Sequence, residues 1–312
     1  MINAIATALA SLVAAQANSK EPAAYGLATA QSVAEDGGET VRAFFSDGYG
    51  NRAGAVAFIR RVHEEPQVEV RVAGGRTLTT VVSLGTWKRV RTAAALFDRT
   101  LVPVPKGEVQ SICLHPWSVS VEVVDPIQPG RPAALRASAQ SACNEGLAVP
   151  LGFELAREAV AALPACALLD AKQYRNDVAR LAGCTLLEGD RAAAALARNA
   201  YGSDWFASPR GERTEYGIRH LFFEDARVDW AGTLANGSEA AAKLWSGRLE
   251  NASLFPQRIV GETANRVQIE GTIVRYTENQ NTKAPVKMVW TSENGFGFRL
   301  RSATVGPDEP AR

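Results

Sequence analysis

The chain has 312 residues, of which 46% are hydrophobic, so it is long enough for two or three domains with buried cores. Its 34 Lys and Arg residues nearly balance its 33 Asp and Glu residues. This balance excludes the strongly basic composition that supports sequence-independent nucleic-acid binding, and we expect no nucleic-acid partner.

Residues 1–17 have the pattern of a secretory signal peptide. An apolar stretch from Ala4 to Ala15 runs into Ala15-Gln16-Ala17, an A-x-A cleavage pattern, and polar Asn18 follows. No Lys or Arg precedes the stretch, so an ordinary N-terminal helix is the alternative. We expect cleavage before Asn18 and a periplasmic or secreted protein. No other stretch approaches the roughly 20 apolar residues of a membrane span, so we expect none in the mature chain.

Residues 18–130 are predicted to form an α+β domain. The runs "TVRAFF", "QVEVRV", "TLTTVVSL" and "VSVEVV" are β-branched or alternating and predict strands, and "TAAALFDRTL" predicts a short helix. The glycines of "DGYGNRAG" are spaced somewhat like a dinucleotide-binding loop. However, "AVAFIRRV" after them favours a strand equally well. We therefore predict a glycine-rich hairpin and no cofactor.

Residues 131–185 are predicted to be a helical segment, set off by the linker-like "DPIQPGRP". The spacing of Leu151, Leu155 and Leu163 predicts a helix that Pro164 ends. Asp170 is placed to cap a second helix, "AKQYRNDVARLAGC", and a third begins at "GDRAAAALARNAYG".

All four cysteines follow the expected cleavage point. In an oxidising compartment they can form two disulfides, with three possible connectivities, and four buried thiols are the alternative. We prefer Cys113–Cys143 as the first pair. A continuous helix over residues 171–183 would be about 20 Å long and would strain a Cys166–Cys184 bond unless the preceding segment folds back. No cysteine spacing fits a metal site, and no metal is expected.

Residues 186–306 show a third pattern, followed by a polar tail at 307–312. A helix comes first, then a strand from His220, a helix from Ser238 to Leu249 and four strand-like runs. In the later strands apolar and polar residues alternate, as in Val286, Met288 and Trp290 around Lys287. The alternation predicts a sheet with one apolar and one polar face.

This order of elements, together with "FFEDARVDWAG…GSEAAAKLW", resembles the NTF2-like fold and specifically SnoaL-like domains. The resemblance implies a curved antiparallel sheet that wraps helices and leaves a cone-shaped pocket. We therefore expect an α+β protein with an N-terminal α+β module, a helical middle segment and a C-terminal NTF2-like domain.

The candidate site lies in this C-terminal region. Asp229, beside Trp230, is the best candidate for a catalytic acid or base. We expect Trp230 and Trp245 near the opening of the cone and Trp290 deeper on the sheet. The full set of candidate ligand-binding residues is Tyr201, Trp205, His220, Trp230, Trp245, Met288, Trp290 and Phe298.

Three functions remain open from the sequence. The first is non-catalytic binding of a small apolar ligand or a protein partner, because sizeable ligand pockets are mostly apolar. The second is a SnoaL-like acid/base enzyme, a lyase, isomerase or hydrolase, that uses Asp229. The third is a structural module that forms a homodimer through the C-terminal sheet, as the resemblance implies.

Overall fold

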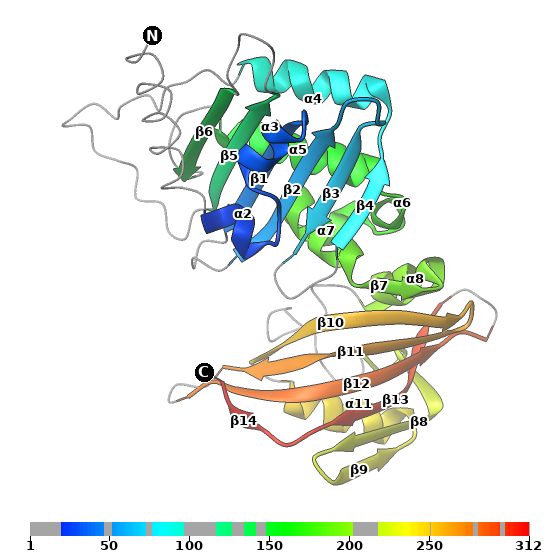
Figure 1. The fold of residues 1–312 in the computed structure, drawn as a ribbon. Helices are drawn as coiled ribbons and strands as arrows, with labels where there is room; N and C mark the ends of the chain where they lie inside the picture. Colours follow the sequence, from blue (N-terminus) through cyan, green and yellow to red (C-terminus); the bar gives the residue numbers. More distant parts are fainter. Residues whose placement is uncertain are drawn as a thin grey trace, which may run out of the picture. The chain divides into compact units, whose positions relative to one another are not determined.

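A computed structural model describes residues 20–46, 52–72, 77–96, 117–126, 134–141, 148–201, 218–249, 251–276, 280–293 and 297–311. The chain divides into two compact units. The N-terminal unit comprises Met1–Pro164 and Asn176–Thr185, and the C-terminal unit comprises Ala165–Arg175 and Leu186–Arg312. Both contain helices and a sheet (Figure 1), so the predicted α+β class is confirmed.

The N-terminal unit is built on a six-stranded antiparallel sheet with the order β4-β3-β2-β1-β5-β6. Its strands are β1 (Glu39–Ser46), β2 (Arg52–Arg60), β3 (Gln67–Arg71), β4 (Thr77–Val81), β5 (Ser118–Asp125) and β6 (Ala134–Ser141). Because β1 and β2 pair antiparallel, the predicted glycine-rich hairpin is confirmed, although residues 47–51 lie outside the described residues.

Helices cover both faces of this sheet (Figure 1). They are α2 (Lys20–Ala24), α3 (Ala30–Glu35), α4 (Leu84–Leu96), α5 (Ala148–Ala162) and α7 (Asp177–Thr185). Helix α5 packs closely on one face, where a Cβ added at Gly152 would lie 2.4 Å from Val119 Cγ1. On the other face, Tyr25 and Leu27 pack with Phe44. The two faces follow from the alternation of side chains along β1.

Two arginines of the sheet hold the N-terminal segment, residues 20–36, in place. Arg42 Nη1 donates to the carbonyl oxygen of Ala28 at 2.6 Å, and Arg71 Nη1 donates to those of Tyr25 and Gly26, each at 2.9 Å. Arg42 is also buried against Glu122, with its Nε 2.6 Å from Oε2. The segment is therefore held through its backbone as well as through apolar packing.

The structure differs from two sequence predictions for this region. Residues 134–141, expected to belong to the helical segment, form β6 and pair with β5 along its whole length. The Ala-rich sequence favours helix locally, and pairing with a neighbouring strand overrides that preference. Residues 92–96 of the predicted short helix at 92–101 form the end of α4, which begins earlier because Ser83 Oγ accepts a hydrogen bond from Thr86 N at 3.0 Å. Residues 97–101 lie outside the described residues.

Helices α4 and α5 are joined by an ion pair between Arg89 and Glu158. Arg89 Nε and Nη2 donate to the two carboxylate oxygens of the nearly buried Glu158 at 2.9 and 2.8 Å. The hydrogen bond from Arg89 lowers the pKa of Glu158, against the opposing effect of burial. A carboxyl whose pKa is lower in the folded state adds stability above its unfolded pKa, and this stability is lost as the pH falls through the folded pKa.

We predict that Glu158→Gln lowers the free energy of unfolding by about 1 kcal/mol at neutral pH, since Arg89 is largely exposed and solvent screens the pair. The difference from wild type should shrink as the pH falls below about 4, near the ordinary pKa of glutamate. Urea unfolding at a series of pH values measures it. Glu154→Gln, which removes an exposed pair with Arg157 on the same helix, should change stability by less than about 0.5 kcal/mol. A difference that grew at acid pH would contradict the assigned direction.

The cysteine region folds differently from the predicted continuous helix. The chain forms α6 (Pro164–Ala167), a 3₁₀ turn η1 (Ala171–Gln173) that Asp170 caps, and then α7. Because the chain turns back before α7, a disulfide joins Cys166 and Cys184. Cys113 and Cys143, the preferred first pair, lie outside the described residues.

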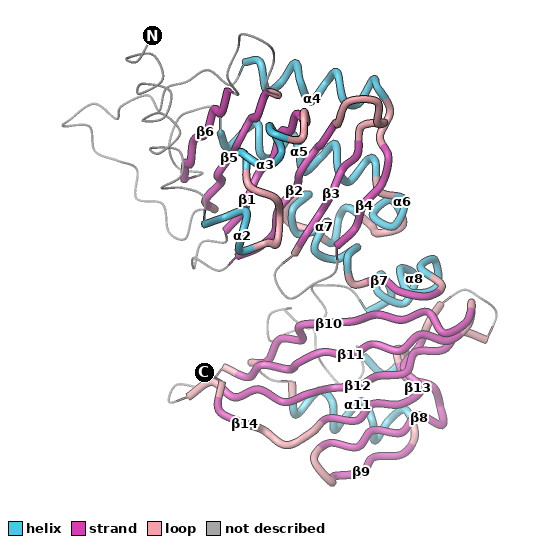
Figure 2. The backbone as a smooth tube through the Cα atoms, viewed as in Figure 1, coloured by secondary structure: helices cyan, strands magenta, loops and turns pink. Residues whose placement is uncertain are grey.

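The C-terminal unit contains an eight-stranded sheet with the path β7-β10-β11-β12-β13-β8-β9, and β14 pairs with β12. The strands are β7 (Leu187–Gly189), β8 (Phe222–Trp230), β9 (Thr233–Asn236), β10 (Ala252–Thr263), β11 (Arg266–Arg275), β12 (Thr282–Thr291), β13 (Arg299–Val305) and β14 (Glu309–Pro310). The helices are α8 (Arg191–Tyr201) and α11 (Ser238–Arg248). Long strands β10, β11 and β12 run side by side (Figure 2).

Most pairs in this sheet are antiparallel, but two are parallel: β7 with β10, and β13 with β8. In the first pair the two backbones approach so closely that a Cβ added at Gly261 would lie 2.0 Å from the carbonyl oxygen of Asp190. The predicted alternation of faces is confirmed: Ile269, Met288 and Trp290 are buried, whereas Lys287 is exposed.

Candidate functional site

A polar pocket of about 880 Å³ lies where β8, α11 and β13 begin. His220 precedes β8, and the turn between β9 and α11 is made by Gly237, whose φ of 86° favours glycine. This turn brings the start of α11 beside the middle of β8, since Gly237 N donates to the Ala226 carbonyl oxygen at 2.8 Å. The lining residues are Arg219, His220, Phe222, Glu224, Asn236, Gly237, Ser238, Glu239, Ala240, Lys243 and Arg299.

The two faces of α11 explain which of its residues reach the pocket. Ala241, Ala242 and Trp245 are buried, as expected for one helical face against the sheet. Lys243 lies on the exposed side and lines the pocket. Arg299 arrives from a different part of the chain, because β13 pairs with β8 and places Leu300 opposite Phe222.

Cationic and anionic side chains share the lining. Arg219 and Glu239 form an exposed ion pair at 3.5 Å. The ammonium of Lys243 makes no hydrogen bond or ion pair with any other residue that the structure describes. The ion pair of Arg299 with Glu293, at 3.8 Å, is too long for a hydrogen bond. The pocket therefore presents cationic donors that the protein itself does not fully use.

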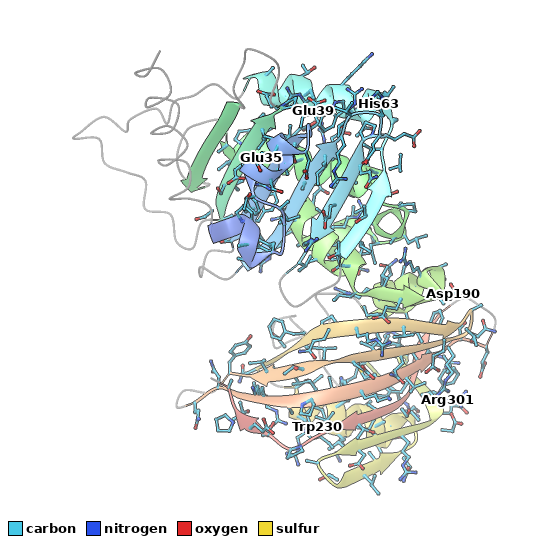
Figure 3. The ribbon with its side chains drawn as sticks, in the orientation of Figure 1. Glu35, Glu39, His63, Asp190, Trp230 and Arg301 are labelled. Carbon is cyan, nitrogen blue, oxygen red and sulfur yellow. The ribbon has the colours of Figure 1, made fainter. Side chains whose placement is uncertain are left out.

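Phe223 fixes the position of Arg299. The guanidinium carbons of Arg299 and Arg301 lie 4.3 and 4.0 Å from the centroid of the Phe223 ring. Arg301, labelled in Figure 3, also pairs with Asp225 and does not line the pocket. Stacking on an aromatic ring restricts the guanidinium. Arg299 is thus held in place while its donors remain available.

The tryptophans predicted near an opening lie in the core instead. Trp230 is 1% exposed and Trp245 is 0% exposed, and their rings pack edge-on with centroids 5.4 Å apart. Trp230 is labelled in Figure 3. Both tryptophans are buried because these large side chains fill the space between α11 and the sheet, where Trp245 also packs on Phe222. Their expected position at an opening is therefore incorrect.

The other candidate aromatic and sulfur side chains of the sheet are equally enclosed. Met288 and Trp290 are 0% exposed and Phe298 is 2% exposed. A side chain with no accessible surface borders no space wide enough for a water molecule. Their role as ligand-binding residues stays a prediction.

The remaining candidates occupy different surroundings. Asp229 accepts a hydrogen bond from Gly232 N at 3.0 Å, which stabilises the turn between β8 and β9, and it does not line the pocket. His220 is exposed and lines the pocket. Tyr201 ends α8, but its side chain lies outside the described residues, as does Trp205.

Sequence reasoning selected His220 and missed most of the pocket. Glu239 and Lys243 could have been found as the polar face of the helix that follows Gly237. Arg299 could not, because nothing local to its strand indicates the parallel pairing with β8. No group of His, Cys, Asp and Glu able to hold a metal ion occurs in the part of the chain that the structure describes. Among the same residues no helix is long and apolar enough to cross a membrane.

No protein-family model matches the chain, and no curated protein matches it. Solved structures with NTF2-like or ketosteroid isomerase-like folds match about a third of it. An NTF2-like protein of unknown function from Shewanella oneidensis is 7% identical, over 31% of this chain and 87% of its own, with a TM-score of 0.28. A ketosteroid isomerase-like protein from Catenulispora acidiphila, in complex with trimethylamine, is 16% identical, over 35% and 82%, with a TM-score of 0.27. A de novo designed protein with a curved β-sheet is 16% identical, over 31% and 85%, with a TM-score of 0.24.

Proposed function

We propose that the C-terminal unit binds a small polar molecule without catalysing its conversion, at the pocket where β8, α11 and β13 begin. The observation that carries this proposal is an open pocket of about 880 Å³, which is in the range of small-molecule sites. The pocket includes His220 and the start of α11, within the stretch that the sequence marked as a candidate site.

The lining favours a polar ligand over the apolar one expected from the sequence. Charged side chains, among them Lys243 and Arg299, line the cavity. The apolar residues proposed for ligand binding, such as Trp245 and Trp290, are instead enclosed. An apolar ligand at this pocket would desolvate charged groups without replacing their hydrogen bonds, which is unfavourable.

The catalytic alternative has less support. Asp229, the best candidate acid or base, has a structural partner in Gly232 N and does not line the pocket. We therefore favour binding over acid/base chemistry. Asp229→Asn should leave the ligand affinity within about twofold of wild type, since an exposed charge that does not contact the ligand contributes little to the binding free energy.

Thermal unfolding of the full chain with a library of small molecules tests the binding proposal, since a ligand that binds only the folded state raises the melting temperature. A hit should lose its effect in Ala240→Trp, which places a large side chain in the pocket. Gly247→Trp is the matched control on the same helix, where an added side chain meets nothing within 4 Å. Equal shifts in both variants would show that the ligand binds elsewhere.

We also propose that the protein is exported. The A-x-A pattern before Asn18 and the Cys166–Cys184 disulfide support this, because structural disulfides persist in oxidising compartments. Mass spectrometry of protein from the periplasm or medium should find a mature chain that begins at Asn18. An intact Met1 in such material would contradict the proposed cleavage.

A further inference from the structure

The charges of the pocket do not cancel. Arg219 and Glu239 neutralise each other as an ion pair. Of the remaining charged lining residues, Lys243 and Arg299 are cationic and Glu224 is anionic. Arg299 also has an ion pair at 3.8 Å with Glu293, which does not line the pocket. The lining itself, with three cationic side chains and two carboxylates, therefore has a cationic excess.

The two remaining cations are suited to oxygen ligands. The guanidinium of Arg299 is held against Phe223 at 4.3 Å and has no hydrogen bond to any residue that the structure describes. A guanidinium fork matches two oxygens of one carboxylate or phosphate, and an ammonium adds a point charge with three donors. Lys243 supplies that ammonium from α11 into the same cavity.

We infer that the molecule bound in this pocket carries an oxyanion, a carboxylate or a phosphate, that Arg299 and Lys243 contact together. The inference rests on the proposed binding function and names its ligand class. The cavity is much larger than one oxyanion, so the rest of the ligand extends along the polar lining, where Asn236 and Ser238 offer neutral hydrogen-bonding groups.

Calorimetric titration of the full chain at constant ionic strength tests the ligand class. Succinate, succinamide and putrescine share a similar carbon chain and differ in charge, and inorganic phosphate forms a fourth arm. We expect succinate or phosphate to bind at millimolar concentration or below, and succinamide and putrescine to bind more weakly. Tighter binding of succinate than of phosphate identifies a carboxylate as the preferred oxyanion, and tighter binding of phosphate identifies a phosphate.

Three variants locate the binding. Lys243→Gln and Arg299→Gln should each weaken binding of the preferred anion by at least about fivefold, because each removes a charge-assisted hydrogen bond. Arg301→Gln is the matched control, since it removes the same charge from the same aromatic ring at a residue outside the pocket. It should change the affinity by less than about twofold.

Glu224→Gln tests whether the bound ligand is an anion or a cation. Removing this carboxylate from the lining should strengthen anion binding by about twofold, whereas it would weaken the binding of a cation. Putrescine or succinamide binding at least as tightly as both anions would overturn the oxyanion inference while leaving a polar-ligand pocket. The oxyanion inference would also be overturned, and the polar-ligand pocket kept, if neither succinate nor phosphate bound while a library ligand bound wild type and not the Ala240→Trp variant. No binding by any probe or library compound would overturn both proposals.

Discussion

Replacing Glu122 with alanine is expected to lower the free energy of unfolding of the N-terminal unit by about 3–5 kcal/mol. The residue is the counterion of Arg42, whose Nε lies 2.6 Å from Glu122 Oε2. Both side chains are almost fully buried, at 2% and 6% exposure. Removing the carboxylate leaves a guanidinium enclosed by protein without its partner, and such a charge costs far more than the net value of the pair.

The same substitution should loosen the N-terminal segment. Arg42 Nη1 donates to the Ala28 carbonyl oxygen, and an uncompensated guanidinium will move toward water and break that bond. Urea unfolding, with a separate transition fitted for each unit, measures the stability change. Amide hydrogen exchange over residues 20–36 measures the local opening, which should increase more than exchange in β2.

Two variants separate charge from packing. Glu69→Ala removes a more exposed partner of Arg71 and should cost less than about 1 kcal/mol. The double variant Arg42→Met and Glu122→Leu should recover most of the loss, because an apolar pair replaces the buried ions. A cost below about 1 kcal/mol for Glu122→Ala would show that solvent reaches Arg42 freely.

The second large effect is expected for Trp245→Ala in the C-terminal unit, at about 3–5 kcal/mol of unfolding free energy. Trp245 is 0% exposed, and its ring lies 5.4 Å from that of Trp230 and 6.2 Å from that of Phe222. Alanine would leave a cavity between α11 and β8 that neighbouring side chains fill only in part.

Because Phe222 also lines the pocket, Trp245→Ala should weaken ligand binding as well as stability. Circular dichroism during urea unfolding gives the free energy, and the titration described above gives the affinity. Phe255→Ala is the control: this phenylalanine is 49% exposed on β10 and should cost much less. A loss for Trp245→Ala no larger than that of the control would contradict the packing described for α11.

Local sequence patterns predicted most elements but not the way distant elements pair. Ile269 and Met288 could be assigned to the buried face because side chains alternate along a strand. β6 was missed because its alanines favour helix until β5 supplies hydrogen bonds along its whole length. The N-terminal anchoring was missed for a similar reason, since Arg42 and Glu122 are far apart in the chain.

The candidate site follows the same division. His220 and the glycine turn before α11 were visible in one continuous stretch. Arg299 joins that stretch only through the parallel pairing of β13 with β8. The tryptophans were predicted near an opening because composition alone does not distinguish an aromatic that lines a cavity from one that fills the space between a helix and a sheet.

The position of β13 also constrains the order in which the C-terminal unit can fold during synthesis. This strand lies between β12 and β8, although β8 leaves the ribosome dozens of residues earlier. Synthesis proceeds at about 5–20 residues per second, so β13 emerges several seconds after β8, β9 and α11. During that time β8 keeps an unpaired edge, and Trp230 lacks the sheet that later encloses it. The C-terminal unit therefore completes its sheet only after β13 has left the ribosome.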